Sequence, residues 1–131
     1  MATYLHTMLR VTDPAASRSF YEALGMEFRR ESDIVRDGHH EATLYFFGFP
    51  GDDAELELTY NTDGRSYELG TAYGHVAIGI DDMTGTLAAL AERGIDPEKP
   101  PYSIREGGSL LCFVQDPDGY RIELIERKGA D

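Results

Sequence analysis

The two halves of this chain repeat one another in outline, and this repeat limits the possible folds more than any other feature. One constant offset along the sequence superimposes three matched pairs: His6 on His75, Asp13 on Asp82, and Gly25 on Gly94. A slightly shorter offset superimposes five more: Leu44 on Leu110, Phe47 on Phe113, Asp52 on Asp118, Glu57 on Glu123, and Leu58 on Leu124. A repeat that keeps the order of its residues predicts one structural unit that is used twice.

The first half predicts a strand, a helix and then further strands. Residues 5–11 alternate between polar and apolar side chains, as a half-buried strand does. Asp13 followed by Pro14 is typical of a helix start, and Gly25 is typical of a helix end near Leu24. The strands expected after the helix cover 27–35, 42–48 and 54–60.

The second half predicts the same order of elements. A strand over 75–80 leads to a helix that Asp81 or Asp82 caps and Gly94 ends. The sequence Asp-Pro-Asp-Gly over 116–119 is typical of a turn, because proline presets one dihedral and glycine accepts positive φ. The strands expected after the helix cover 102–105, 109–115 and 120–126.

These elements indicate an α+β fold made of paired βαβββ modules within a single domain over 1–131. The first module covers 1–60, a linker covers 61–73, and the second module covers 74–131. We expect the two half-sheets to form a concave, barrel-like mixed sheet with the helices outside.

Four polar residues occupy matching places in the repeat. Side chains two apart on a strand share a face, so Glu57 and Glu123 each lie on the face opposite their neighbouring leucines. His6 and His75 lie at equivalent positions in the first strand of each half. Two neutral imidazoles and two carboxylates suit a divalent first-row metal, so we predict a metal site made of these four side chains.

Two other histidines, His39 and His40, lie outside the repeat and follow the turn-like pair Asp37-Gly38. We interpret them as residues of a solvent-exposed loop rather than as metal ligands.

Composition and charge exclude several classes of function. A formal net charge of -12 opposes binding to nucleic acid or to anionic membranes. The single cysteine, Cys112, lies among apolar residues and is expected to be a buried strand residue. Neither a signal peptide nor a membrane-spanning run is visible, which favours a cytoplasmic location.

Four segments resemble glyoxalase I (lactoylglutathione lyase), within the vicinal-oxygen-chelate superfamily, and the resemblance covers nearly the whole chain. The first segment is shared widely across the superfamily, and the last two are specific to glyoxalase I. The segments are His-Thr-Met-Leu-Arg-Val from His6, Leu-Glu-Leu-Thr-Tyr-Asn from Leu56, Tyr-Glu-Leu-Gly-Thr-Ala-Tyr-Gly-His from Tyr67, and Phe-Val-Gln-Asp-Pro-Asp-Gly-Tyr-Arg-Ile-Glu-Leu from Phe113.

The resemblance implies a lyase of methylglyoxal detoxification. Its substrate is the hemithioacetal of methylglyoxal and glutathione, which becomes S-lactoylglutathione through a metal-stabilised enediolate. It also implies a homodimer in which His6 and Glu57 of one subunit complete a metal site with His75 and Glu123 of the other. Short bacterial relatives are typically activated by Ni²⁺ or Co²⁺, with Zn²⁺ as the alternative. The ligand set itself does not identify the metal.

The resemblance also assigns roles to individual residues. Glu123 is the expected catalytic base, and Glu57 is its pseudo-symmetric partner, which could act on the other stereoisomer. Arg10 and Asn61 match positions that contact glutathione, and Arg105 is a third expected substrate contact. One departure is Glu106, which stands where relatives commonly carry lysine before the glycine pair. A different low-molecular-weight thiol is therefore an alternative.

Two other classes of function compete with this interpretation. One is a different metal enzyme of the superfamily, such as an epimerase, a thiol transferase or an extradiol dioxygenase. The two glutamates count against the dioxygenase, which uses two histidines and one carboxylate. The other is a metal-free ligand-binding or resistance protein of the same fold, because fold alone does not decide function. A purely structural dimer leaves the four matched residues unexplained.

Overall fold

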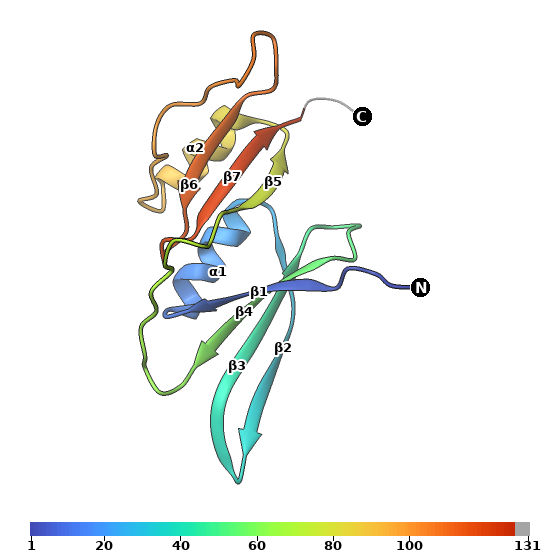
Figure 1. The fold of residues 1–131 in the computed structure, drawn as a ribbon, viewed down its shortest axis with the longest axis vertical. Coiled ribbons are helices and arrows are strands. Elements are labelled where there is room, and N and C mark those ends of the chain that lie inside the picture. Colours follow the sequence, from blue (N-terminus) through green and yellow to red (C-terminus); the bar gives the residue numbers. More distant parts are fainter. Residues whose placement is uncertain (128–131) are drawn as a thin grey trace. The chain divides into compact units, whose positions relative to one another are not determined.

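The structure is a computed structural model, and it describes residues 1–127 of the chain. The chain divides into two compact units, the first over Met1–Glu68 and the second beginning at Leu69. The boundary lies inside the linker expected from the sequence. Each unit holds one helix and one mixed sheet, as the predicted α+β class requires (Figure 1).

The first unit has the complete predicted order of strand, helix and three strands. Its sheet has the strand order β1-β4-β3-β2, in which β1 is parallel to β4 and the other pairs are antiparallel. The elements are β1 (His6–Val11), α1 (Pro14–Ala23), β2 (Glu27–Arg36), β3 (His39–Gly48) and β4 (Glu55–Asn61).

Local sequence explains the turns of the first unit. The Asp13 carboxylate caps α1 by accepting a hydrogen bond from the Ala16 amide, and Gly25 ends the helix at a φ of 101°. Asp37 and Gly38 both have positive φ, which is the geometry of the tight turn that joins β2 to β3.

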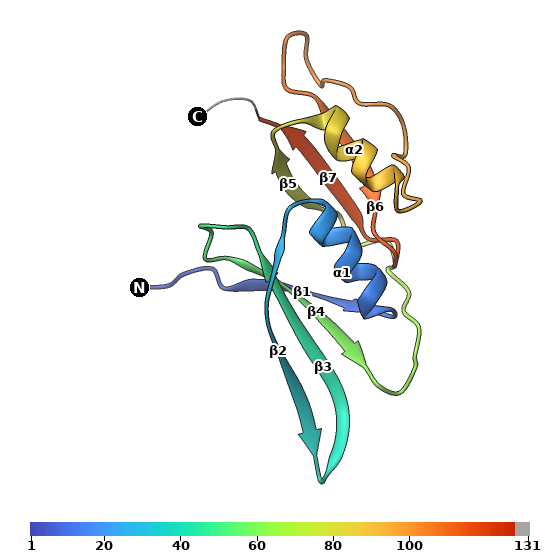
Figure 2. The same cartoon turned by 180° about the vertical axis from the view of Figure 1, so that it is seen from behind.

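The core of the first unit lies between α1 and one face of its sheet. The helix buries Phe20 and Tyr21, and the strands bury Leu9, Val11 and Leu58. Figures 1 and 2 view this layer from opposite sides. Because side chains alternate along β1, His6, Met8 and Arg10 lie on the face opposite Leu9 and Val11.

The second unit has a three-stranded sheet of order β5-β7-β6, with β5 parallel to β7 and β6 antiparallel to it. Helix α2 lies in front of this sheet in Figure 2. The elements are β5 (Val76–Ile80), α2 (Met83–Ala91), β6 (Leu111–Gln115) and β7 (Arg121–Glu126). Of the two predicted caps, Asp82 is the one whose side chain accepts from the helix, at the Gly85 amide.

The strand predicted over 102–105 is wrong. This region makes only an isolated bridge between Tyr102 and Leu111, so the described part of the second unit is βαββ rather than βαβββ. Pro100 and Pro101 lack amide hydrogens, and Gly107 has a φ of 75°. These residues bracket the segment and prevent a continuous ladder of hydrogen bonds.

Neither helix of residues 1–127 has the length and apolar character that crossing a membrane demands.

Candidate metal centre

The first predicted ligand pair meets within the first unit. Parallel pairing of β1 with β4 places Met8 beside Glu57, and His6 lies two residues earlier on the same face of β1. The Glu57 side chain reaches back toward His6, so that 3.1 Å separates His6 Nε2 from Glu57 Oε1.

Glu57 is a buried carboxylate with a second polar contact. Only 7% of the residue is exposed, and its Oε2 accepts a 2.7 Å hydrogen bond from the Thr59 hydroxyl on the same face of β4. The two oxygens therefore face different partners, Oε1 toward His6 and Oε2 toward Thr59. A buried carboxylate that is held at both oxygens has a defined orientation before any ligand binds.

The second predicted ligand pair meets within the second unit in the same way. His75 directly precedes β5, and Ala77 pairs with Glu123 on β7. The distance from His75 Nε2 to Glu123 Oε1 is 3.2 Å. The Tyr73 hydroxyl donates to the Arg121 carbonyl at 3.2 Å, which ties the segment before His75 to β7. Burial raises the pKa of the Tyr73 phenol above its usual range.

A phenylalanine borders each pair on the neighbouring strand. Phe46 lies opposite Glu57 in the β3–β4 ladder, and Phe113 lies opposite Glu123 in the β6–β7 ladder. The sequence offset matched Phe47 to Phe113, which is wrong by one residue. Since a slip of one residue reverses the face, Phe47 points to the buried core and is 1% exposed.

The geometry of each pair fits two neighbouring ligands of one metal ion. Two donor atoms that each lie about 2.1 Å from an ion, at right angles, are roughly 3.0 Å apart. The two observed separations are 3.1 and 3.2 Å. Residues 1–127 contain no cluster of three or more side chains of histidine, cysteine, aspartate or glutamate that could hold a metal ion. Each unit by itself brings together one histidine and one glutamate.

Comparison with known proteins identifies the family. The model of the Glyoxalase/Bleomycin resistance protein/Dioxygenase superfamily matches residues 3–124. The chain is also 44% identical to lactoylglutathione lyase from Haemophilus influenzae over 129 residues, which are 96% of this chain and 93% of that protein. The chain belongs to this superfamily, and within it to the lactoylglutathione lyases.

Solved structures of glyoxalase I are similar to the chain throughout its length. A trypanothione-dependent glyoxalase I from Leishmania major is 38% identical, with a TM-score of 0.78, over 96% of this chain and 87% of that one. Glyoxalase I from Zea mays is 33% identical, with a TM-score of 0.84, over 97% of this chain. The chain spans about half the length of the maize protein, of which it covers 45%.

The three predicted substrate contacts of this chain lie in different surroundings. Arg10 is exposed on the same face of β1 as His6. Asn61 ends β4, and its side-chain amide donates to the Tyr67 hydroxyl at 2.7 Å. Arg105 shares a pocket of about 590 Å³ with Glu123. The structure therefore brings one of the three together with a predicted ligand inside one pocket.

The pocket beside Glu123 is formed by the segment after α2 and by the face of β6 and β7 that carries Glu123 and Ile125. Glu106, the residue that departs from the family pattern, is also part of its lining. The lining residues are Ile104, Arg105, Glu106, Gly107, Gly108, Ser109, Leu111, Glu123 and Ile125. Of the four predicted ligands, Glu123 is the one that lines this pocket.

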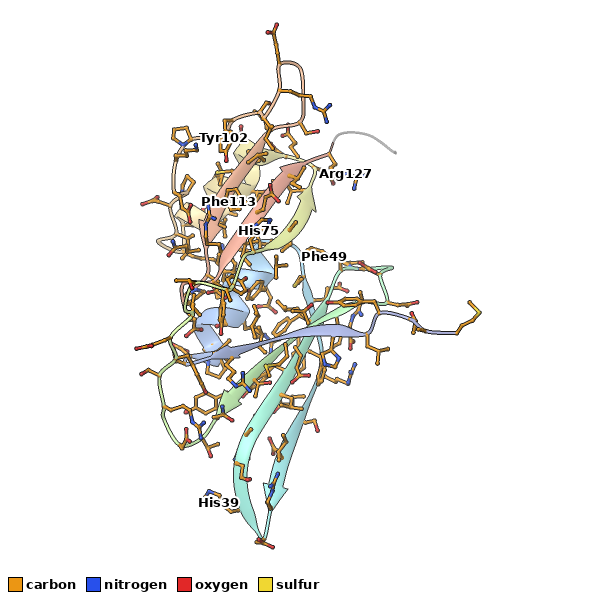
Figure 3. The ribbon with its side chains drawn as sticks, in the orientation of Figure 1. His39, Phe49, His75, Tyr102, Phe113 and Arg127 are labelled. Carbon is orange, nitrogen blue, oxygen red and sulfur yellow. The ribbon has the colours of Figure 1, made fainter. Side chains whose placement is uncertain are left out.

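The remaining histidines are exposed, as the sequence predicted, but they lie in a strand rather than in a loop. His39 and His40 open β3 directly after the turn, and Figure 3 shows His39 at the tip of this hairpin. His40 Nε2 lies 2.8 Å from the Thr43 hydroxyl and 3.3 Å from Asp33.

Sequence reasoning missed two kinds of residue near the ligands. Thr59 shares a face with Glu57, but the sequence alone gave it no role. Phe46 and Phe113 looked like ordinary strand residues. Strand periodicity could have identified Thr59, because the residue two positions after a glutamate lies beside its carboxylate on the same face of the strand.

Proposed function

We propose that this chain is a metal-dependent glyoxalase I, a lactoylglutathione lyase that converts the methylglyoxal–glutathione hemithioacetal to S-lactoylglutathione. The observation that carries the proposal is the recurrence of one histidine–glutamate pair, at 3.1 and 3.2 Å, in both units of a chain from this family. A metal-free binding protein would not need two such pairs.

The four proposed ligands are His6, Glu57, His75 and Glu123. Each unit holds one histidine–glutamate pair, which is half of the proposed ligand set. We propose that the two pairs meet between two copies of the chain, in a cytoplasmic homodimer, with His6 and Glu57 from one copy and His75 and Glu123 from its partner. Ni²⁺ or Co²⁺ is favoured over Zn²⁺.

The reaction is an isomerisation that moves one proton between adjacent carbons and one between their oxygens. The C–H bond at the carbon that carries sulfur breaks, and a C–H bond forms at the neighbouring carbon. The hydroxyl on the carbon that carries sulfur loses its proton and becomes the thioester carbonyl, while the former ketone oxygen gains a proton and becomes an alcohol. A divalent cation, when bound, supplies positive charge that stabilises negative charge on two adjacent substrate oxygens. The protein must supply a carboxylate that takes and returns the proton.

We assign that proton transfer to Glu123. Glu57 is engaged at both oxygens, by His6 and by Thr59, whereas the residue two positions after Glu123 is Ile125, which has no hydroxyl. Glu123 also lines the open pocket, and 16% of its side chain is exposed compared with 10% for Glu57. Glu57 is thus better suited to act as a fixed ligand, and Glu123 as the group that moves a proton.

The thiol part of the substrate requires cationic and amide groups. Arg10, Asn61 and Arg105 are the proposed contacts, because a guanidinium binds a carboxylate through two parallel hydrogen bonds. The acidic Glu106 in the pocket beside Glu123 makes a thiol other than glutathione the alternative to be tested. The relative from Leishmania major is described as trypanothione-dependent.

A turnover assay across metals and thiols tests the proposal. The metal-stripped protein is incubated with Ni²⁺, Co²⁺ or Zn²⁺ and with hemithioacetals of methylglyoxal, and thioester absorbance is followed. We expect no turnover without metal and the fastest turnover with Ni²⁺ or Co²⁺ and the glutathione adduct. Turnover of another thiol adduct alone would correct the substrate, and no turnover with any metal and thiol would overturn the proposed reaction.

A further inference from the structure

An arginine stacks on each of the two phenylalanines that border the ligand pairs. The Arg30 guanidinium carbon lies 4.0 Å from the centre of the Phe46 ring, and the Arg121 guanidinium carbon lies 4.0 Å from the centre of the Phe113 ring. This distance is well within the range of a cation–π interaction. An arginine therefore covers the phenylalanine opposite the predicted ligand glutamate in both units.

Each phenylalanine in turn meets the proposed histidine ligand edge to face. The His6 and Phe46 ring centres are 6.0 Å apart at an interplanar angle of 84°. The His75 and Phe113 ring centres are 5.2 Å apart at 80°, and Figure 3 shows these two side chains next to each other. The phenylalanine ring thus limits the orientations of the imidazole beside it.

A glutamate holds each arginine through two parallel hydrogen bonds. Arg30 donates to the two carboxylate oxygens of Glu55 at 2.8 and 2.9 Å, and Arg121 donates to those of Glu98 at 3.0 and 2.9 Å. Arg30 lowers the pKa of the Glu55 carboxyl, and Arg121 lowers the pKa of the Glu98 carboxyl. A bidentate pair fixes the plane of the guanidinium as well as its position.

The two ion pairs have opposite polarity in the two units. On β4 the residue two positions before the ligand Glu57 is the acidic partner, Glu55, and the arginine comes from β2. On β7 the residue two positions before the ligand Glu123 is the arginine itself, and its acidic partner Glu98 lies between α2 and β6. The charges have exchanged places, yet an arginine covers the phenylalanine in both units.

We propose that Arg30–Glu55 and Arg121–Glu98 are positioning pairs that orient the imidazoles of His6 and His75 for metal binding through Phe46 and Phe113. This inference rests on the proposed metal site. The exchange of charges supports the inference. An ion pair that served only solubility would not be expected to place its guanidinium on the phenylalanine ring in both arrangements. The pairs act before metal arrives, so their effect is present in the metal-free protein.

The test compares Arg30→Met and Arg121→Met with a matched control, Arg18→Met. Arg18 also lies over a phenylalanine, at 4.5 Å from the centre of Phe28, and also pairs with a glutamate, Glu22. It touches neither proposed ligand pair. Co²⁺ affinity is measured by competition with a chelator, and the imidazole resonances of the four histidines are recorded by NMR in the metal-free protein.

We expect Arg30→Met and Arg121→Met each to weaken Co²⁺ binding about threefold to fivefold, and Arg18→Met to leave it unchanged. In the metal-free protein, Arg30→Met should shift the His6 resonance and leave His75 in place, and Arg121→Met should do the reverse. Unchanged affinity and unchanged resonances in both variants would overturn the inference. An equal loss of affinity in Arg18→Met would do so too, because the effect would then be general.

The opposite polarity of the two units supplies a rescue experiment. The double variant Arg30→Glu/Glu55→Arg exchanges the two charges of this pair and also removes the 3.4 Å contact of Glu55 with Arg29. We expect it to bind Co²⁺ more tightly than Arg30→Glu alone. Equal Co²⁺ affinities of the single and double variants would count against the inference. Thermal unfolding identifies any variant that has not folded. If either charge variant does not fold, the Arg30→Met and Arg121→Met variants decide. If the unaltered chain binds no Co²⁺, the proposed metal site is wrong and the positioning role with it.

Discussion

The hydroxyl of Thr59 donates a 2.7 Å hydrogen bond to Oε2 of Glu57, and both residues lie on the same buried face of β4. The corresponding place beside Glu123 belongs to Ile125. The two otherwise matched carboxylates therefore differ in one hydrogen bond, and for this reason we propose Glu57 as a fixed ligand and Glu123 as the group that moves a proton.

Replacing Thr59 with valine is expected to weaken metal binding. The change keeps the shape of the side chain and removes the hydroxyl, so Oε2 of Glu57 loses its donor. Loss of a partner that orients a ligand costs about tenfold or more in metal affinity. Chelator competition measures the change, and Thr59→Ser, which keeps the hydroxyl, should bind metal nearly as well as the unaltered chain. Equal affinity in Thr59→Val would show that the hydrogen bond does not orient Glu57.

Replacing Glu123 with glutamine should remove most of the activity and leave much of the metal bound. The amide keeps an oxygen for the metal but cannot accept the proton, and loss of a general base lowers kcat by about 100-fold or more. Metal content and kcat are measured on the same sample. Glu57→Gln is the matched variant, and we expect it to lose proportionately more metal. Normal turnover in Glu123→Gln would rule out Glu123 as the base.

Strand periodicity and the internal repeat were enough to predict His6, Glu57, His75 and Glu123 as ligands, and the structure brings each histidine beside one glutamate. Asp13 and Asp82 predicted the two helix starts, and Asp37-Gly38 predicted a turn. The 3.1 Å meeting of His6 with Glu57 depends on parallel pairing between β1 and β4, which lie far apart in the sequence. Composition carries no information about that register.

The parts that the sequence did not predict depend on long-range pairing or on competing local effects. The match of Phe47 to Phe113 failed because the two halves differ by one residue in the loop before the ligand strand, which only the ladders reveal. Arg121 on β7 stacks on Phe113 of β6 and also pairs with Glu98, which lies outside both strands. No periodicity within a single segment encodes such a contact.

Replacing Arg105 with alanine should raise KM for the hemithioacetal and leave kcat nearly unchanged. Arg105 is exposed in the pocket that Glu123 lines, so it can bind the thiol part of the substrate without touching the reacting carbons. An exposed ion pair contributes roughly threefold to fivefold in binding. Steady-state kinetics separates the two constants. A fall in kcat with KM unchanged would contradict a role in thiol binding.

Cys112 should react with thiol reagents only after unfolding. Its side chain is fully buried, and burial raises the pKa of the thiol, so the thiolate is scarcer at neutral pH than it would be in water. A colorimetric thiol assay should detect almost none of the thiol in the native protein and one equivalent per chain in denaturant. Rapid reaction of the native protein would contradict the burial of this residue.

Replacing Asp116 with alanine should destabilise the β6–β7 hairpin, which sets the register between Phe113 and Glu123. The Asp116 residue is 4% exposed, and its Oδ1 accepts hydrogen bonds from the Asp118 and Tyr120 amides, both at 2.9 Å. Leaving such groups without partners lowers the free energy of unfolding by about 2–3 kcal/mol. Denaturant unfolding measures this loss, and Asp116→Asn, whose amide oxygen can still accept both bonds, should retain most of the stability. If both variants unfold like the unaltered chain, the carboxylate does not hold the turn, and the register must be fixed by the strands alone.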